Sequence, residues 1–445
     1  MIGRLAAAAL LGALATTALA APPHPNVVLI LADDLGWGDV GFNGRKEWAT
    51  PNLDRIAASG ATGRRFYASA VVCAPSRAAL LTGKHPIHCG VSRNDEDLPA
   101  AEVTIAEALK AQGYATGLFG KWHHGRPPRG QTNYTHPMDQ GFDEFFGFTD
   151  ATDAWQKFPE TLWDGRERVA SSGYADDLFA RHATAFLEGH RRGPFFLEVA
   201  FTAPHFDVEA PEDEVAKHRG KFAEADPARP VHASYAAMVT RLDRCVGQIL
   251  EALERLALED ETLVLFTSDH GATFEAGNLG ASDFHDSNRP FRGQKRTLWE
   301  GGTRVPLAVR WPGRIAAGTA WSAPFAMIDL FPTILAAAGA VPDPAWGVDG
   351  VDLLPCWTAA APFPERTLFW EWRSEGADQA AAMRGDLKLV VNRGGKPELF
   401  DVVADPSERR DVSAGHPEAV QRLRSELKTW LATEGAAPVA ERTPR

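Results

Sequence analysis

Residues 71–83 read Val-Val-Cys-Ala-Pro-Ser-Arg-Ala-Ala-Leu-Leu-Thr-Gly, and this stretch predicts a helix that begins beside a cysteine. Pro75 suits a first helical turn, because its ring fixes φ and it has no N–H to leave unpaired. Gly83 is typical of the residue that ends a helix. Unpaired N–H groups and the helix dipole favour anions at this end, and Arg77 lies one turn further on. Cys73 is therefore predicted to lie at an anion site, although a buried cysteine beside an ordinary helix start fits the same residues.

Residues 26–32, Asn-Val-Val-Leu-Ile-Leu-Ala, form a continuous apolar run, which is typical of a parallel strand buried on both faces. Asp33 and Asp34 follow this run directly. Ligands of open α/β sheets bind at the carboxyl ends of the strands, and two adjacent carboxylates repel each other unless a cation lies between them. The pair therefore indicates a cation site, with a solvated turn as the alternative.

Three further predicted strands, at residues 115–119, 194–201 and 262–267, also lead into titratable residues. These residues are Lys121 with His123, His205, and Asp269 with His270; Lys295 lies further along the chain. A single histidine in such a place is more often structural than catalytic. Because a doubly wound sheet brings strand ends to one edge, however, all these groups are expected to converge with the Cys73 segment.

Predicted strands and helices alternate from residue 26 to about residue 340. This alternation predicts an α/β fold in which helices cover both faces of a large parallel or mixed sheet. From about residue 346 the pattern changes to short strands and one helix, at residues 367–373, 379–383, 387–392 and 417–431. We therefore expect a larger domain over residues 24–345 and a small antiparallel sheet with one helix within residues 346–445.

Residues 126–170 are rich in proline, glycine and aromatic residues and show no clear periodicity. They are expected to form a loop or insertion beside the site, where specificity is often determined. Trp155 and Trp163 lie in this segment and would either stack on a carbohydrate or pack in the core.

The amino terminus has the features of an export signal. Arg4 precedes an apolar run that ends in Ala18-Leu19-Ala20, a small-x-small cleavage pattern. The run is short for a membrane span, so residues 1–20 predict a periplasmic or secreted protein without stable membrane association. An uncleaved membrane anchor is the alternative.

The composition is that of a soluble globular protein, with 445 residues, 44% hydrophobic and 23% charged. The net charge of -12 and the absence of a basic run argue against a nucleic-acid partner. Four cysteines are too few for a disulfide scaffold. Which of Cys89, Cys245 and Cys356 would pair is left open by the sequence.

Together these motifs resemble those of the formylglycine-dependent sulfatases. Cys73-x-Pro75-Ser76-Arg77 is similar to the family signature. Further segments that resemble family motifs are Leu80-Leu81-Thr82-Gly83, Gly120-Lys121-Trp122-His123-x-Gly125, Thr202-Ala203-Pro204-His205, and Lys295 followed by Glu300-Gly301-Gly302-x-Arg304-Val305-Pro306. The resemblance covers about residues 26–312 and is weaker beyond. It implies an alkaline-phosphatase-like fold and hydrolysis of sulfate monoesters of a small molecule or glycan, with aryl sulfates as surrogate substrates.

The resemblance also implies one divalent metal ion. The implied ligands are Asp33, Asp34, Cys73, Asp269 and His270. Ligation mainly by oxygen favours calcium. Many members carry Asn where this chain has His270, and an imidazole nitrogen shifts the preference towards manganese or zinc. His124 also occupies a position where Leu is common, which would reshape the pocket wall.

The implied nucleophile is formylglycine (3-oxoalanine), made from Cys73 by a maturation enzyme that this chain does not encode. One hydroxyl of the hydrated aldehyde would attack sulfur, and the second would expel sulfate as the aldehyde reforms. Lys121, His205 and Lys295 would neutralise the sulfate oxygens. His123 is the candidate base and His205 the candidate acid. Arg77 would hold the hydrate and offset the carboxylates.

Two alternative functions stay open at this point. The first is a phosphatase or phosphonate monoester hydrolase on the same fold, because phosphoryl and sulfuryl groups are close in shape and phosphonate ester hydrolases also carry His at position 270. The second is a non-catalytic periplasmic glycan-binding protein, which the export signal and the tryptophans would suit. A two-zinc phosphatase is disfavoured, because a second full set of Asp and His ligands is not evident.

Overall fold

Strand β1 (Asn26–Asp33) lies in the middle of the main sheet, and all of its residues are buried. It pairs in parallel with β8 (Phe195–Pro204) on one side and with β9 (Thr262–Ser268) on the other. Alternate residues of β1, beginning with Val27, pack into one hydrophobic core, and the intervening residues, beginning with Val28, pack into a second. The strand is therefore buried on both faces, as its apolar run predicts.

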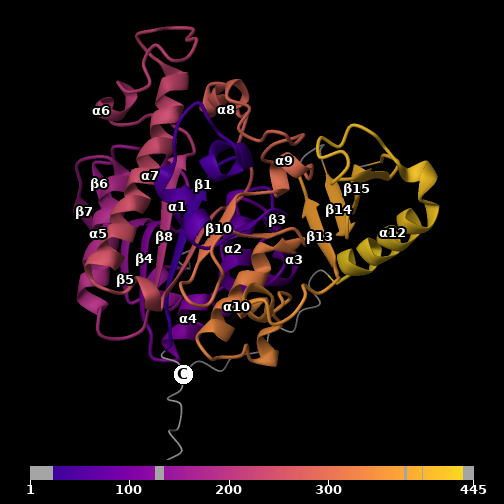
Figure 1. Ribbon diagram of the computed structural model, residues 1–445, viewed down its shortest axis with the longest axis horizontal. Coiled ribbons are helices and arrows are strands. Elements are labelled where there is room, and N and C mark those ends of the chain that lie inside the picture. The colour runs from indigo at the N-terminus through magenta and orange to yellow at the C-terminus, as the bar shows by residue number, and fades with distance from the viewer. Residues whose placement is uncertain (1–23, 126–134, 375–377, 393, 434–445) are drawn as a thin grey trace, which may run out of the picture.

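The computed structural model describes residues 24–125, 135–374, 378–392 and 394–433 (Figure 1). Within them the main sheet has ten strands and is mixed, with a parallel centre and antiparallel pairs towards its edges. In spatial order the strands are β11 (Thr319–Trp321), β2 (Ala61–Gly63), β10 (Leu307–Arg310), β9, β1, β8, β4 (Ala115–Lys121), β5 (Glu144–Phe148), β6 (Thr161–Asp164) and β7 (Glu167–Ala170). A separate short pair consists of β3 (Phe66–Tyr67) and β12 (Phe325–Ala326). The predicted export signal at residues 1–20 lies outside the described residues.

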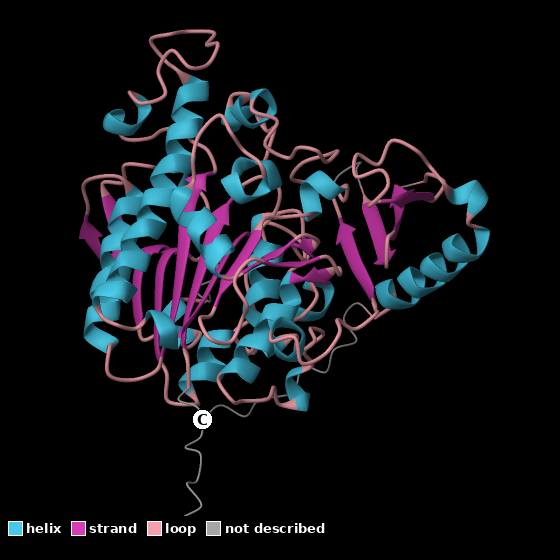
Figure 2. Cartoon of the chain, viewed as in Figure 1, coloured by secondary structure: helices cyan, strands magenta, loops and turns pink. Residues whose placement is uncertain are grey.

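Helices cover both faces of the main sheet (Figure 2). One core contains residues of α2 (Cys73–Thr82), α3 (Pro86–Cys89), α4 (Ile105–Lys110), α10 (Leu330–Ala337) and α11 (Leu354–Trp357). The opposite core contains residues of α1 (Pro51–Ser59), α5 (Ala175–His190), α7 (Val231–Arg255) and α8 (Ala281–Phe284). Two further short helices are α6 (Glu212–Val215) and α9 (Glu300–Thr303). The predicted large mixed sheet between helices is confirmed.

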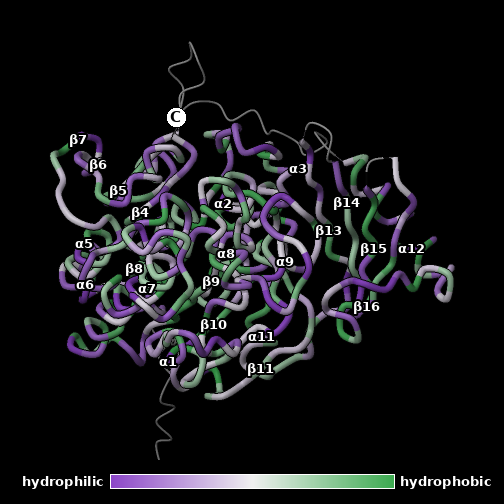
Figure 3. Tube along the Cα trace, turned by 90° about the horizontal axis from the view of Figure 1, so that it is seen from above, coloured by the Kyte–Doolittle hydropathy of each residue, from purple (hydrophilic) through white to green (hydrophobic). Residues whose placement is uncertain are grey.

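The longest described helix, α7, is amphipathic, and the tube around its label in Figure 3 carries both hydrophobic and hydrophilic residues. Its buried face includes Met238, Leu242, Val246, Ile249 and Leu253, which recur every three or four residues. Within the described part of the chain no helix is both long and apolar enough to cross a membrane.

The segment 126–170 departs in part from the sequence prediction. Residues 126–134 lie outside the description, but β5, β6 and β7 extend the main sheet where a loop was expected. Strand β5 is almost entirely buried, with the pattern Glu-Phe-Phe-Gly-Phe. A short strand buried on both faces has no apolar–polar alternation, so its period could not be recognised in the sequence.

A second sheet lies beside the main body at the carboxyl-terminal end of the chain (Figure 1). Its antiparallel strands are β13 (Thr367–Trp372), β14 (Gln379–Arg384), β15 (Leu387–Asn392) and β16 (Glu398–Asp401), and α12 (Pro417–Leu431) packs on it. The predicted small sheet with one helix is confirmed, although β16 was not predicted. We call β13–β16 and α12 the C-terminal unit.

A buried ion cluster joins the C-terminal unit to the main body. Lys388 Nζ on β15 lies 2.9 Å from Glu300 Oε1 and 3.2 Å from Glu408 Oε1, and all three side chains are 0% exposed. Glu300 also accepts a hydrogen bond from the Tyr67 hydroxyl at 2.9 Å. One lysine thus offsets two buried carboxylates, with Arg304 Nη1 3.2 Å from Glu300 on the other side.

We expect Lys388→Met to destabilise the protein by about 3–5 kcal/mol, because it leaves the buried Glu408 carboxylate without its cation and Glu300 with Arg304 alone. The measurement is the free energy of unfolding in denaturant. Lys396→Met, at an exposed lysine of the same unit, serves as the control and should change stability by less than about 0.5 kcal/mol. Equal effects of the two substitutions would contradict the role of the cluster.

Candidate active site

The carboxyl ends of the central strands meet beside the amino end of α2. Asp33 ends β1 and Asp34 follows it, while Lys121 ends β4. His205 follows β8, and Asp269 with His270 follows β9. Side chains that are far apart in the sequence are therefore brought to one sheet edge, as strand-end geometry predicts.

Helix α2 begins at Cys73 itself, two residues earlier than Pro75 suggested. Pro75 is tolerated there because an N–H in the first turn has no intrahelical partner to lose. Gly83 caps the helix with φ 68°, as predicted. The N–H of Ala74 donates to Asn94 Oδ1 at 3.0 Å, so a distant loop satisfies one of the first-turn donors.

Four of the predicted metal ligands form one buried group. The ligand atoms of Asp33, Asp34, Cys73 and His270 all lie within 4.8 Å of one another. Cys73 Sγ is 3.5 Å from Asp33 Oδ1 and 3.3 Å from His270 Nε2. Two carboxylates and an imidazole beside the Sγ position are a donor set that fits a divalent cation.

Asp269, the fifth predicted ligand, adjoins this group, with its Oδ1 3.7 Å from His270 Nε2. Its Oδ2 accepts hydrogen bonds from Arg77 Nε and Nη2 at 3.2 and 3.1 Å. Its Oδ1 accepts the backbone N–H groups of Asp34 and His270 at 3.1 and 3.0 Å. Burial raises the pKa of Asp269 to about 7, against the positive charges of His270 and Arg77. Asp269 therefore connects Arg77 to the turns that carry the other ligands.

Two lysines offset the aspartate pair. Lys121 Nζ lies 2.6 Å from Asp33 Oδ2, and Lys295 Nζ lies 2.9 Å from Asp34 Oδ1. Burial opposes ionisation of the Cys73 thiol, but the positive charges of Lys121 and Lys295 outweigh it and lower the pKa of Cys73. The site is thus electropositive at the position of the predicted nucleophile.

His123 has one free ring nitrogen. Its Nε2 lies 3.4 Å from the backbone oxygen of Asn94, and its Nδ1 has no hydrogen-bond partner among the described residues. Burial, with the charges of Lys121 and Arg77, holds the pKa of His123 well below its usual value. A neutral imidazole with an unoccupied nitrogen can accept a proton.

His205 also has one ring nitrogen that a backbone oxygen engages. Its Nδ1 lies 2.7 Å from the backbone oxygen of Phe206, and its Nε2 lies 3.8 Å from Asp34 Oδ2. Burial holds the pKa of His205 well below its usual value, although Asp33 raises it. With Nδ1 donating to Phe206, Nε2 carries the lone pair of the neutral ring.

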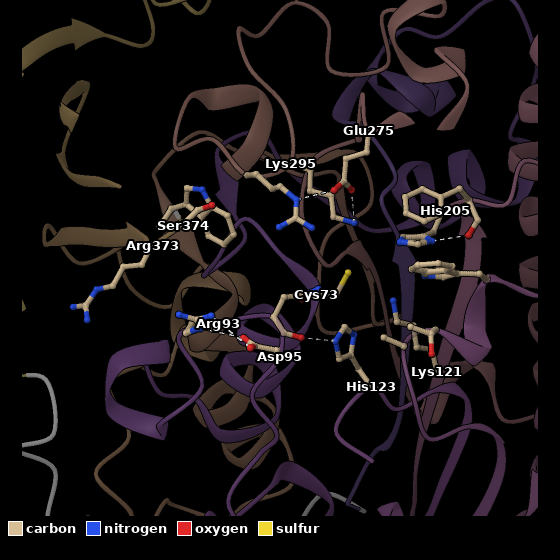
Figure 4. Close-up of a pocket in the computed structure, with 17 residues that line it drawn as sticks. Cys73, Arg93, Asp95, Lys121, His123, His205, Glu275, Lys295, Arg373 and Ser374 are labelled. Carbon is tan, nitrogen blue, oxygen red and sulfur yellow. Dashed lines mark hydrogen bonds and ion pairs between the residues drawn. The ribbon is translucent and has the colours of Figure 1, made fainter. Parts of the chain in front are cut away.

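A cavity of about 590 Å³ opens onto these groups. Cys73, Lys121, His123, His205 and Lys295 all line it, and Figure 4 shows the other four side chains around Cys73. Arg77, whose side chain is 3% exposed, is not among the lining residues.

Several wall residues were not anticipated as site residues. They are Arg93, Asn94, Asp95, Glu275, Arg296, Trp372, Arg373 and Ser374. Trp372 ends β13, so the C-terminal unit contributes to the cavity. The sequence predicted that strand, but nothing in its residues indicated where the second sheet lies relative to the first.

The two tryptophans of segment 126–170 have different surroundings. Trp155 lines the cavity and is 41% exposed, whereas Trp163 is not among the lining residues and stands beside Arg168, 5.5 Å from its ring centroid. His124 is fully buried against the edge of Trp122 and does not line the cavity. All four cysteines are free thiols in the described structure.

One buried carboxyl near Arg77 has no role in the sequence analysis. Glu198 lies in the middle of β8, is 4% exposed, and its Oε2 has no hydrogen-bond partner among the described residues. Burial raises the pKa of Glu198 to about 7, and the charge of Arg77 opposes the shift.

The chain is similar to two protein families and to several curated proteins over most of its length. A sulfatase model matches residues 25–340, and a model of the C-terminal region of N-sulphoglucosamine sulphohydrolase matches residues 292–435. Steryl-sulfatase of Mus musculus is 32% identical over 92% of this chain and 81% of that protein. N-acetylgalactosamine-6-sulfatase of Homo sapiens is 34% identical over 91% of this chain and 85% of that protein.

Solved structures show the same fold. Ps i-CgsB, in complex with k-i-k-neocarrahexaose, superposes with a TM-score of 0.83 at 30% identity, covering 92% of each chain. Phosphonate monoester hydrolase of Agrobacterium radiobacter superposes with a TM-score of 0.67 at 23% identity, covering 92% of this chain and 96% of that one. At 23% identity, the similarity to the phosphonate monoester hydrolase shows a shared fold alone. This fold is alkaline-phosphatase-like.

We expect Glu198→Gln to stabilise the protein at pH 8 by up to about 3 kcal/mol and to have little effect at pH 4. The folded state holds the Glu198 proton more tightly than the unfolded state, so the wild type loses stability as the pH rises from 4.5 towards 7. Glutamine removes that loss. Unfolding free energies at both pH values measure the effect, and an equal change at pH 4 and pH 8 would exclude this explanation.

Proposed function

Because the chain belongs to the sulfatase family, we propose that it hydrolyses sulfate monoesters of carbohydrates, using a formylglycine made from Cys73 and one divalent metal ion. The chain is a sulfuric ester hydrolase like its relatives. One observation carries the proposed chemistry: Cys73 lies within 4.8 Å of the donors of Asp33, Asp34 and His270. It also lines a cavity together with Lys121 and Lys295.

The metal ion would be held by Asp33, Asp34, Asp269 and His270, with the side chain at position 73 as a further ligand. When bound, such an ion neutralises oxygen charge and lowers the pKa of a coordinated hydroxyl. The three carboxylates favour calcium, and the imidazole of His270 lets manganese compete. We propose calcium.

Formylglycine would supply, as its hydrate, a hydroxyl nucleophile and a second hydroxyl whose ionisation releases sulfate. It requires a separate maturation enzyme. The positive charges that lower the pKa of the Cys73 thiol, and its place at the start of α2, support a role at this position.

The basic residues would bind and neutralise the reacting sulfate. Lys121 and Lys295 line the cavity with their ammonium groups beside the aspartate pair. Positive charge fixed in a site that excludes water stabilises negative charge that develops on oxygen. Arg77, held by Asp269, would keep the start of α2 aligned with the ligand turns.

Two histidines would move protons. His123 is neutral with Nδ1 unoccupied, which suits the base that takes a proton from the hydrate. His205 would be the acid for the leaving alcohol. Since burial holds the pKa of His205 well below its usual value, this role requires the negative charge of the bound ester to favour its protonated form. Each transfer contributes roughly 10²–10⁴ in rate.

The cavity wall supports a carbohydrate substrate. Trp155 presents an exposed ring, and Asp95 and Glu275 provide carboxylates that can accept sugar hydroxyls. The similarity to N-acetylgalactosamine-6-sulfatase and to Ps i-CgsB with its bound neocarrahexaose points to the same substrate class. The similarity to steryl-sulfatase points to steryl sulfates as a second substrate class among the relatives.

We also propose that the protein is exported to the periplasm or secreted, with residues 1–20 as its signal. We further propose that residues 24–345 form a larger domain and residues 346–445 a smaller one. The strands of the two parts form separate sheets, and α11 of the second part packs in a core of the main sheet.

The remaining alternative is hydrolysis of phosphonate or phosphate monoesters. His270 and the fold shared with a phosphonate monoester hydrolase favour it. Release of product from matched aryl sulfate, phosphate and phosphonate esters separates the two functions. A preference for the phosphorus esters would replace the proposed function.

Cys73→Ala is expected to reduce sulfate release from 4-nitrophenyl sulfate to below about one percent of wild type, because it removes the nucleophile. Cys356→Ala, at another free cysteine outside the cavity, is the matched control and should keep its activity. Mass spectrometry of the wild-type Cys73 peptide should find the thiol replaced by an aldehyde. An active enzyme with an intact thiol would rule out the formylglycine route.

Asp269→Asn is expected to lose bound metal and at least about 99% of activity together, because it weakens the ligand charge and the hold on Arg77. Elemental analysis after dialysis against calcium and manganese gives the metal content and identity. Near-ultraviolet circular dichroism checks that the variant is folded. Full activity in metal-free protein would refute the metal assignment.

A further inference from the structure

Arg296 follows Lys295 in the chain and lines the same cavity as Cys73, yet none of the proposed steps uses it. Its side chain is 42% exposed, whereas the side chains of Lys121 and Lys295 are 1% and 2% exposed. Arg296 therefore lies nearer to the mouth of the cavity than the lysines assigned to the reacting sulfate.

The position of Arg296 is fixed from two sides. Its backbone has φ 67°, in the left-handed region that non-glycine residues seldom adopt, and its N–H donates to the backbone oxygen of Val71 at 2.9 Å. Its guanidinium lies 5.7 Å from the ring centroid of Trp372 in the C-terminal unit. A strained backbone that the surrounding structure maintains is typical of a residue held for a ligand.

Arg296 shares a carboxylate with Lys295. Its Nε donates to Glu275 Oε1 at 2.7 Å, while Lys295 Nζ lies 3.4 Å from Glu275 Oε2. Two positive charges thus face one negative charge in this corner of the cavity, where Figure 4 labels Glu275 and Lys295. Among the described residues none forms a hydrogen bond with the terminal nitrogens of Arg296, so this end of the guanidinium is available to a ligand.

We propose that Arg296 binds a second anionic group of the substrate, a carboxylate or a second sulfate on the sulfated sugar or on its neighbour. The inference rests on the proposed function, because it requires the reacting sulfate to lie at Lys121 and Lys295. A guanidinium fork matches carboxylate and sulfate oxygens in geometry and charge. An ester with a single negative charge would leave this end of Arg296 unused, so doubly anionic saccharides are the preferred substrates.

The test compares four sulfate esters built on the same hexosamine: the sulfated ring alone, and the same ring with a neutral hexose, a hexuronic acid or a second sulfate attached. The wild-type enzyme should have its highest kcat/KM with one of the two doubly anionic esters. Arg296→Gln should lower that value by about 10–100-fold, mainly through KM, as expected for a lost charged hydrogen bond. Its effect on the two singly anionic esters should be at least tenfold smaller.

Two control variants accompany Arg296→Gln. Arg296→Lys keeps the charge but not the fork and should retain part of the preference. Arg255→Gln removes an exposed arginine that pairs with Glu188 outside the cavity, and it should not alter the preference. Calorimetric binding of the preferred ester to Cys73→Ala, with and without Arg296→Gln, gives a readout that does not depend on turnover; the double variant should bind about 10–100-fold more weakly.

The outcomes are distinguishable. Release of sulfate from all four esters without a preference for either doubly anionic one would overturn this inference and leave the proposed function intact. An equal loss on all four esters in Arg296→Gln would place Arg296 at the reacting sulfate and would also overturn it. A wild-type enzyme, with its Cys73 converted, that releases sulfate from no ester would overturn the proposed function and this inference with it.

Discussion

Charge balance in a buried space is the constraint on which this structure depends. Three aspartates at strand ends, Asp33, Asp34 and Asp269, are almost completely excluded from water. An ionised carboxylate in such a place costs several kcal/mol unless cations and hydrogen bonds replace the lost water. The chain provides Lys121, Lys295 and Arg77 for this purpose. The proposed metal ion would add positive charge to the same cluster. The added charge would then offset the negative charge of a bound sulfate ester.

The same constraint extends to the contact between the two sheets. Glu300 lies in the segment that also carries Lys295 and Arg296, and its carboxylate is held by Lys388 of the C-terminal unit. Trp372 of that unit supports the guanidinium of Arg296. The small sheet is therefore part of the wall of the site. The family model that begins at residue 292 also spans the catalytic segment and the small sheet together.

The sequence predicts those parts of the fold in which consecutive residues show both the type of element and its place in the sheet. The apolar run of β1 followed by Asp33 and Asp34 is an example, because burial on both faces and a strand-end ligand position are both visible in consecutive residues. Strand β5 could not be recognised, since a buried strand of five residues has no distinctive period. Arg296 and Trp372 could not be assigned to the cavity, because their meeting depends on packing between residues far apart in the chain.

Asn94 contacts the proposed nucleophile helix and the proposed base at the same time. Its side chain accepts the N–H of Ala74 next to Cys73, and its backbone oxygen lies beside His123 Nε2. One loop residue therefore sets the separation between two reacting groups that belong to different elements. During divergence of the family, substitutions on the exposed side of this loop should be tolerated. Insertions and deletions should be selected against, because a change in the length of the loop would displace Cys73 and His123 relative to each other.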